Sequence, residues 1–217
     1  KPGYLPAQRQ VEAPWQDYAF LPDVVLIPPD PVVTTIDLTD TTQPMHVAAG
    51  SVVTDDDGTR QAVVMIPQGT TATMVMPDGS TQPLTTLNVR LTEYTVGANG
   101  PEAMPGALPP TSQYTYAFEL SADEAVAVEA RDVRLSQPLP VYVDNFLSFP
   151  VGETVPVGAY NPEQGIWVPE PNGKVIKILG STNALADIDS NGDNVPDDAT
   201  VLATLGISPA ERQQLTL

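Results

Sequence analysis

The sequence predicts an all-β protein: a β-sandwich-like domain, or two, with a proline-rich N-terminal strap and a short C-terminal calcium-loop and helical segment. Many runs are short and rich in Val, Ile and Thr, and turn residues separate them. The 217 residues include 24 prolines and 15 glycines but only 6% aromatic residues. Short strands joined by such turns are typical of sandwiches and barrels. A hydrophobic content of 41% argues against global disorder.

Residues 1–31 form the predicted strap. Proline interrupts this segment every few residues, which favours an extended chain over a helix or a central strand. Trp15, Tyr18 and Phe20 are the side chains expected to pack this strap against a neighbour. A flexible arm is the alternative interpretation, because terminal segments are ordered only where something holds them.

Residues 32–180 form the predicted β-region, as one domain or as two with a break near residue 110. Leu87, Val89 and Leu91 alternate with polar residues, so they should share one buried face of a strand. Turn signals occur at residues 55–58, 77–80 and 171–173, each with a glycine that accepts positive φ. The proline-rich residues 97–112 are expected to form a long ordered loop.

Residues 181–217 are expected to form an Asp-rich calcium loop followed by two short helices. The first helix should run from about Asp198 to Leu205, where Gly206 suits a helix end. Ser208 and Glu211 have the spacing of a capping box, and Pro209 occupies the favoured first helical position of the second helix.

The segment from Asp187 to Asp198, DIDSNGDNVPDD, has the ligand spacing of a calcium loop. Calcium prefers six to eight oxygen ligands, which alternate residues of a tightly curled loop supply, and glycine at the sixth position permits the turn. Gly192 occupies that sixth position. The predicted Ca²⁺ ligands are Asp187, Asp189, Asn191, Asp193 (through its backbone carbonyl) and Asp198.

Two features depart from a sensor-type EF-hand loop. Asp198 replaces the usual glutamate at the twelfth position, and the preceding residues are too few for an entering helix. The residues DSNGDNVPDD resemble instead the calcium repeats of dockerin and thrombospondin-type proteins, a register in which Asp197 also contributes. A solvated acidic turn is the alternative without metal, and Asp55-Asp56-Asp57 is a weaker second candidate whose simplest interpretation is a hairpin turn.

The net charge of −18 argues against several classes of partner. Nine basic residues are too few and too scattered to follow a phosphate backbone, so we expect no nucleic-acid binding. No segment approaches the apolar length of a membrane span, so we expect no membrane insertion. The chain does not begin with Met and shows no signal peptide at Lys1, and we interpret it as a piece of a longer protein.

No catalytic motif supports an enzyme. His46 is the single histidine and there is no cysteine, which argues against a zinc site and against a Ser-His-Asp triad. We therefore expect no enzymatic activity. A hydrolase with paired carboxylates stays open as a third hypothesis, because the chain is rich in acids but no motif places two of them together.

Residues 89–125, 138–169 and 172–180 resemble the β-rich region that precedes the YD repeats of large bacterial Rhs (teneurin-like) proteins. The acidic loop followed by LGISPAERQQL fits the same region, so the resemblance covers roughly residues 20–217. Residues 63–74, VVMIPQGTTATM, more loosely resemble a ZU5-type β-domain.

The resemblance implies a structural role. Rhs proteins enclose a toxic or adhesive cargo in a YD-repeat shell, and β-domains before the shell cap or plug it. By this analogy the chain is a non-catalytic module of a secreted or surface protein, whose partner is the shell of its own parent polypeptide. The alternative is a carbohydrate-binding or adhesin module, with Trp15, Trp167 and the tyrosines as a sugar platform.

Overall fold

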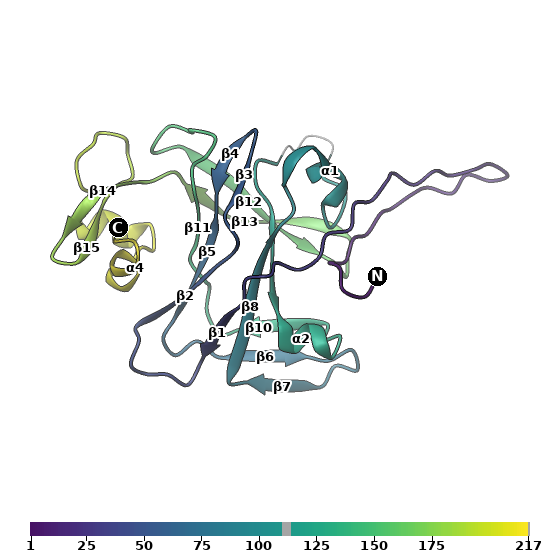
Figure 1. Cartoon of the computed structure of the whole chain (residues 1–217), viewed down its shortest axis with the longest axis horizontal. Coiled ribbons are helices and arrows are strands. Elements are labelled where there is room, and N and C mark those ends of the chain that lie inside the picture. Colours follow the sequence, from purple (N-terminus) through teal and green to yellow (C-terminus); the bar gives the residue numbers. More distant parts are fainter. Residues whose placement is uncertain (110–113, 217) are drawn as a thin grey trace.

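The computed structural model describes residues 1–109 and 114–216, and it confirms the all-β prediction. Within these residues the strands form three three-stranded and three two-stranded sheets, all antiparallel (Figure 1). The predicted break near residue 110 lies outside the described residues.

Two of the three-stranded sheets enclose the main core. The first has the order β1-β8-β9 and the second the order β11-β5-β2. Their strands are β1 (Thr34–Asp37), β8 (Thr86–Glu93), β9 (Phe118–Ala122), β2 (Met45–Ala49), β5 (Ala62–Pro67) and β11 (Val141–Val143). Leu87, Val89 and Leu91 are buried in this core with Val64 and Ile66, which confirms the alternation expected for the first three.

The remaining strands form one further three-stranded sheet and three two-stranded ones. The sheet β10-β6-β7 contributes Ala72 to the same core. The strands of that sheet are β10 (Asp132–Leu135), β6 (Ala72–Val75) and β7 (Thr81–Leu84). The two-stranded sheets pair β3 (Val53–Asp55) with β4 (Gly58–Arg60), β12 (Thr154–Asn161) with β13 (Ile166–Lys174), and β14 (Lys177–Thr182) with β15 (Leu185–Asp189). The turn signals at residues 55–58 and 77–80 join β3 to β4 and β6 to β7, as predicted.

One of the expected turns was wrong. Residues 171–173 are not a turn, because they lie inside β13, where a two-stranded ribbon leaves free edges that tolerate proline. The long loop expected at residues 97–112 begins with a 3₁₀ turn, η1 (Gly97–Asn99), and the short helix α1 (Gly100–Ala103), which carries a proline in its first turn. Its last residues, 110–112, lie outside the described residues.

The C-terminal unit (residues 176–216) has its own small core. Ala186 and Ile188 of β15 pack against Leu202, with partly buried Ile178 and Ile207 around them. Its helices are α3 (Ala199–Thr204) and α4 (Pro209–Gln214), and the predicted capping box at Ser208 and Glu211 is present. A further short helix, α2 (Asp123–Ala127), follows β9.

Candidate functional site

The acidic loop (residues 187–198) begins in the last residues of β15 and ends at the start of α3. Gly192 has a φ of 86°, which confirms the sharp turn expected there, and Asn194 also has a left-handed φ of 61°. Lys177 of the neighbouring strand β14 donates from Nζ to Asn194 Oδ1 at 2.7 Å. The hairpin therefore holds the loop at its start and at Asn194, and two left-handed residues curl it.

Asp189 is the fully buried centre of this loop, with no exposed surface. Its Oδ1 accepts hydrogen bonds from the backbone N–H groups of Gly192 at 2.7 Å and Asn191 at 3.0 Å, and its Oδ2 accepts one from Asn194 at 2.9 Å. Burial opposes ionisation, but these backbone donors outweigh it together and lower the pKa of Asp189. The side chain is therefore a buried carboxylate cradled by the loop's own backbone.

Asn191 and Asp193 continue the pattern at alternate positions. Asn191 Oδ1 accepts from Asp193 N at 2.9 Å, and Asp193 Oδ1 accepts from Val195 N at 2.8 Å. Asp197 closes the loop at its base, because its Oδ2 accepts from Ser190 N at 2.7 Å. Asp189, Asn191, Asp193 and Asp197 thus each direct a side-chain oxygen toward the loop backbone, and Val195 interrupts the alternation.

The first and last residues of the predicted ligand set, Asp187 and Asp198, bind groups outside the loop. Asp187 Oδ2 accepts from the Thr182 hydroxyl at 2.7 Å, and its Oδ1 lies 3.9 Å from the guanidinium of Arg212. Asp198 caps α3, where Oδ1 accepts from Thr200 N at 2.8 Å and Val201 N at 3.0 Å, and these bonds lower the pKa of Asp198. Asp187 and Asp198 therefore bind groups outside the loop, whereas Asp189, Asn191, Asp193 and Asp197 bind its backbone.

The fit to a metal ion is incomplete in this conformation. Within residues 1–109 and 114–216, no three His, Cys, Asp or Glu side chains are close enough together to hold an ion. The oxygens of Asp189 and Asn191 already accept backbone N–H groups. Calcium binding at this loop would require the oxygens of Asp189, Asn191, Asp193 and Asp197 to turn toward one centre.

Backbone contacts connect the acidic loop to the turn before β12. A Cβ atom on Gly192 would lie 3.0 Å from the carbonyl oxygen of Val151, and one on Gly152 would lie 3.3 Å from the backbone of Asn191. Both glycines have a left-handed φ. The loop and this turn therefore pack backbone to backbone, which larger residues at either position would prevent.

Arg60 forms a second polar cluster, with Asp55 and Glu93, that sequence reasoning missed. Its side chain is 1% exposed and binds Asp55 through two N–H groups at 2.7 and 2.8 Å, and it binds Glu93 at 2.7 Å. The ring of Phe146 covers its guanidinium carbon at 4.7 Å. Asp55, the weaker metal candidate, is thus the partner of a buried arginine. Only its spacing of five residues from Arg60 on a hairpin could have indicated this.

The aromatic residues proposed as a sugar platform are not brought together. Trp15 is 88% exposed on the strap, whereas Trp167 packs against the cluster of Leu5, Tyr94 and Met104. Trp167 lies opposite Tyr160 across β13 and β12, with ring centroids 5.4 Å apart. A pocket of about 420 Å³ lies beside this pair, lined also by Gln8, Gln10 and Ile166.

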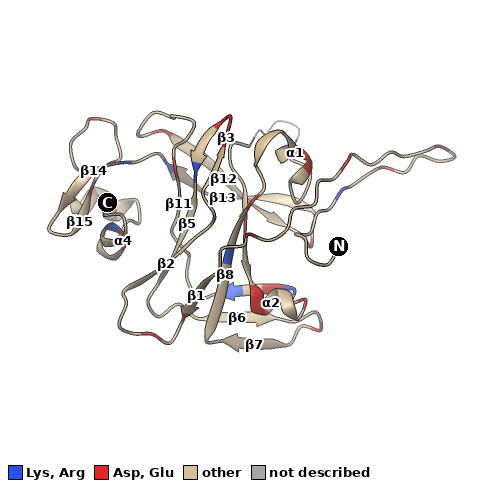
Figure 2. Ribbon diagram, viewed as in Figure 1, with Lys and Arg blue, Asp and Glu red and all other residues tan. Residues whose placement is uncertain are grey.

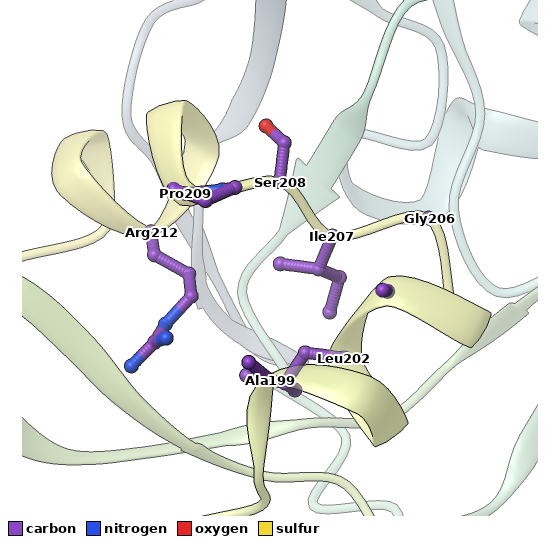
Figure 3. Close-up of a pocket in the computed structure, with 8 residues that line it drawn as sticks. Ala199, Leu202, Gly206, Ile207, Ser208, Pro209 and Arg212 are labelled. Carbon is purple, nitrogen blue, oxygen red and sulfur yellow. The ribbon is translucent and has the colours of Figure 1, made fainter.

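A second pocket, of about 400 Å³, lies between α3 and α4 (Figure 3). Leu202 and Ile207 point into it, and Arg212 forms one side. The Arg212 guanidinium is held by the carbonyl oxygen of Ala186 at 2.9 Å. His46, in strand β2, lines neither of these two pockets.

No protein-family model, no curated protein and no solved structure matches this chain. Among the residues that the structure describes, no helix is long and apolar enough to cross a membrane.

Proposed function

We propose that the chain is a non-catalytic structural module of a large secreted or surface Rhs-type bacterial protein, where it packs against the YD-repeat shell of its own parent polypeptide. The observation that carries this proposal is the strap. Its side chains Trp15, Tyr18 and Phe20 are 88, 86 and 88% exposed. Large aromatic side chains that cluster on one exposed segment indicate an interaction surface more often than a surface that stays in solvent. Docking onto a neighbour would explain why this segment carries exposed aromatic side chains, whereas in a free monomer they would stay in water without a function.

The test is association with the rest of the parent polypeptide. The chain and the remainder of the reading frame that encodes it are produced separately and mixed. We expect a complex that survives size-exclusion chromatography, and cross-links detected by mass spectrometry between the chain and a YD-repeat segment. A reading frame without YD repeats, or two pieces that do not associate, would refute the proposal.

The second part of the proposal is a structural calcium ion in the acidic loop. Asp189 is a buried carboxylate that forms no salt bridge within the described part of the chain, and Asn191, Asp193 and Asp197 follow it at calcium-loop spacing. A bound cation would neutralise carboxylates that otherwise repel one another. It would also fix the C-terminal unit against the turn at Val151 and Gly152, which touches the loop.

Thermal unfolding with calcium and with a chelator tests the ion. A ligand bound only by the native state raises stability by RT ln(1 + [L]/Kd). We expect a higher Tm with calcium than with chelator, and calcium in the purified protein by elemental analysis. An unchanged Tm, together with protein that carries no metal, would show that the segment is a solvated acidic turn.

A second candidate function is binding of a neutral carbohydrate, and the pocket beside Tyr160 and Trp167 favours it. Its lining combines two aromatic rings with the side-chain amides of Gln8 and Gln10 and contains no charged residue. Aromatic faces and amides are the groups that bind the apolar faces and hydroxyls of sugars. A glycan array with wild type and Gln10→Ala tests it. Absence of binding to any glycan, or equal binding by both proteins, would dismiss this pocket.

A further inference from the structure

The strap leaves the body of the protein from a fixed base. Leu5 N donates to Ile27 O at 2.9 Å, Gln8 N to Pro105 O at 2.7 Å, and Val25 N to Glu102 O at 3.1 Å. These bonds join the two legs of the strap to each other and to the segment around α1. The base therefore holds the strap tip (residues 10–24) as an arm that projects from the molecule (Figure 1).

Arg9 strengthens this base. Its guanidinium donates to the carbonyl oxygens of Met104 at 3.0 Å and Glu102 at 2.7 Å. Leu5 is only 7% exposed and packs with Ile27 against Tyr94 and Met104. The direction of the arm is thus set by packing as well as by hydrogen bonds.

The strap tip has no comparable support. Within the described part of the chain, the tip's hydrogen bond is an internal one, from Tyr18 N to Asp17 Oδ1 at 2.7 Å. Gln16 has a left-handed φ of 60°, which reverses the chain between Trp15 and Asp17. The side chains of Trp15, Tyr18, Phe20 and Leu21 remain 58 to 88% exposed. The arm therefore presents an aromatic turn that the described part of the body does not cover.

The charge of the strap tip limits which kinds of surface can bind it. The tip contains Glu12, Asp17 and Asp23 and no basic residue, so it carries three negative charges. The chain as a whole has a net charge of −18, and acidic positions are spread over the molecule (Figure 2). A second copy of the chain, or an anionic membrane surface, would repel the tip. A basic surface would attract it.

We infer that the strap tip is a docking peptide, held out from the body by its base, whose receptor is an apolar protein groove bordered by Lys and Arg. The inference rests on the proposed function, because that function places the receptor on the remainder of the parent polypeptide. Aromatic side chains would fill the groove, and the three carboxylates would meet the basic border. Pro14 and Pro22 restrict the tip in the free state, which reduces the entropy lost on docking.

Binding of the chain to the separately produced remainder of its polypeptide, measured by biolayer interferometry, tests this receptor. The double variant Trp15→Ala/Phe20→Ala should bind about tenfold or more weakly than wild type. Val52→Ala, which truncates a side chain 62% exposed elsewhere on the body, is the matched control and should bind like wild type. Because the aromatic side chains contact little of the body, the Tm of the double variant should not change.

Salt dependence tests the basic border separately. Raising NaCl from about 0.05 M to about 0.5 M screens attraction between exposed charges and should weaken wild-type binding. The triple variant Glu12→Gln/Asp17→Asn/Asp23→Asn should lose most of this salt dependence. A photo-crosslinking residue in place of Trp15, but not of Val52, should form covalent bonds beside Lys or Arg residues of the remainder.

The outcomes separate the two proposals. If wild type binds the remainder but Trp15→Ala/Phe20→Ala binds equally well, the docking inference is wrong and the module function stands. If the triple variant shows the same salt dependence as wild type, the receptor has no basic border and the inference is also wrong. If wild type does not bind the remainder, the proposed function fails, and the inference fails with it.

Discussion

The Arg60 cluster and the acidic loop each stabilise a carboxylate, but with opposite kinds of partner. Asp55 binds a buried guanidinium, whose hydrogen bonds, with one from the backbone N–H of Gly97, lower the pKa of Asp55. Asp189 is buried more completely, yet it binds only backbone N–H groups and forms no ion pair within the described chain. The first carboxylate has its cation within the fold, and the second does not.

The difference lies in where the partners come from. Arg60 lies in β4 and Glu93 in β8, so the cluster forms only when distant strands meet. The donors to Asp189 belong to the five residues that follow it. A local cradle of N–H groups still leaves a negative charge without a cation, so an external cation bound at the acidic loop would add stability.

Removing the cation from the Arg60 cluster should give the largest effect. Arg60→Met would leave Glu93 and Asp55 facing each other without a cation, and breaking a buried ion pair in this way costs about 3–5 kcal/mol. We expect this loss in the free energy of unfolding measured with urea. The surface variant Arg134→Met removes an exposed pair 3.5 Å from Asp132 and should change stability by less than about 1 kcal/mol. Equal effects of the two variants would show that the cluster contributes no more than a surface pair.

Calcium stabilisation of two variants would show which aspartate is the first ligand of the acidic loop. At about 100 times its Kd a ligand stabilises the native state by ~2.7 kcal/mol. The observed geometry predicts that Asp189→Asn abolishes this gain, whereas Asp187→Asn keeps most of it, because Asp187 binds Thr182 on the hairpin. Differential scanning fluorimetry with calcium and with chelator measures both. Loss of the gain in Asp187→Asn alone would restore the register that begins two residues earlier.

The sequence predicted local features better than distant ones. The calcium spacing, the turn at Gly192 and the capping box of Ser208 and Glu211 depend on neighbours within a few residues, and the turn and the box are present. The hydrogen-bond partner of Asp187 was harder to predict, because Asp187 lies on a hairpin whose partner residues are set by pairing with β14. Arg60 could not be identified as buried, since nothing in its own segment indicates that Glu93 and Phe146 meet it.

Acid should remove the contribution of Asp189. A carboxyl whose folded-state pKa is lowered contributes stability that is present above its unfolded pKa, near 3.9, and that is lost as pH falls through the folded value. The stability difference between wild type and Asp189→Asn should therefore be constant near neutral pH and shrink below about pH 4. Urea unfolding at several pH values measures it. Val195→Ala, in the same loop, has no titratable group, and its difference from wild type should not depend on pH. A difference for Asp189→Asn that stayed constant in acid would contradict the lowered pKa.

The smallest predicted effect concerns the contact between the C-terminal unit and the main sheets. Tyr142 of β11 donates from its hydroxyl to Glu211 Oε1 at 3.0 Å, and Glu211, 4% exposed, also closes the capping box of α4. Tyr142→Phe removes this hydrogen bond and leaves a buried carboxylate oxygen without it, at a cost of about 1–2 kcal/mol. Because the bond joins the C-terminal unit to the main sheets, amide hydrogen exchange should increase in α4 and β15 and stay unchanged around Arg60. An increase of the same size in both regions would mean that they unfold as one unit, and that the acidic loop is supported by the same core as the buried ion pair.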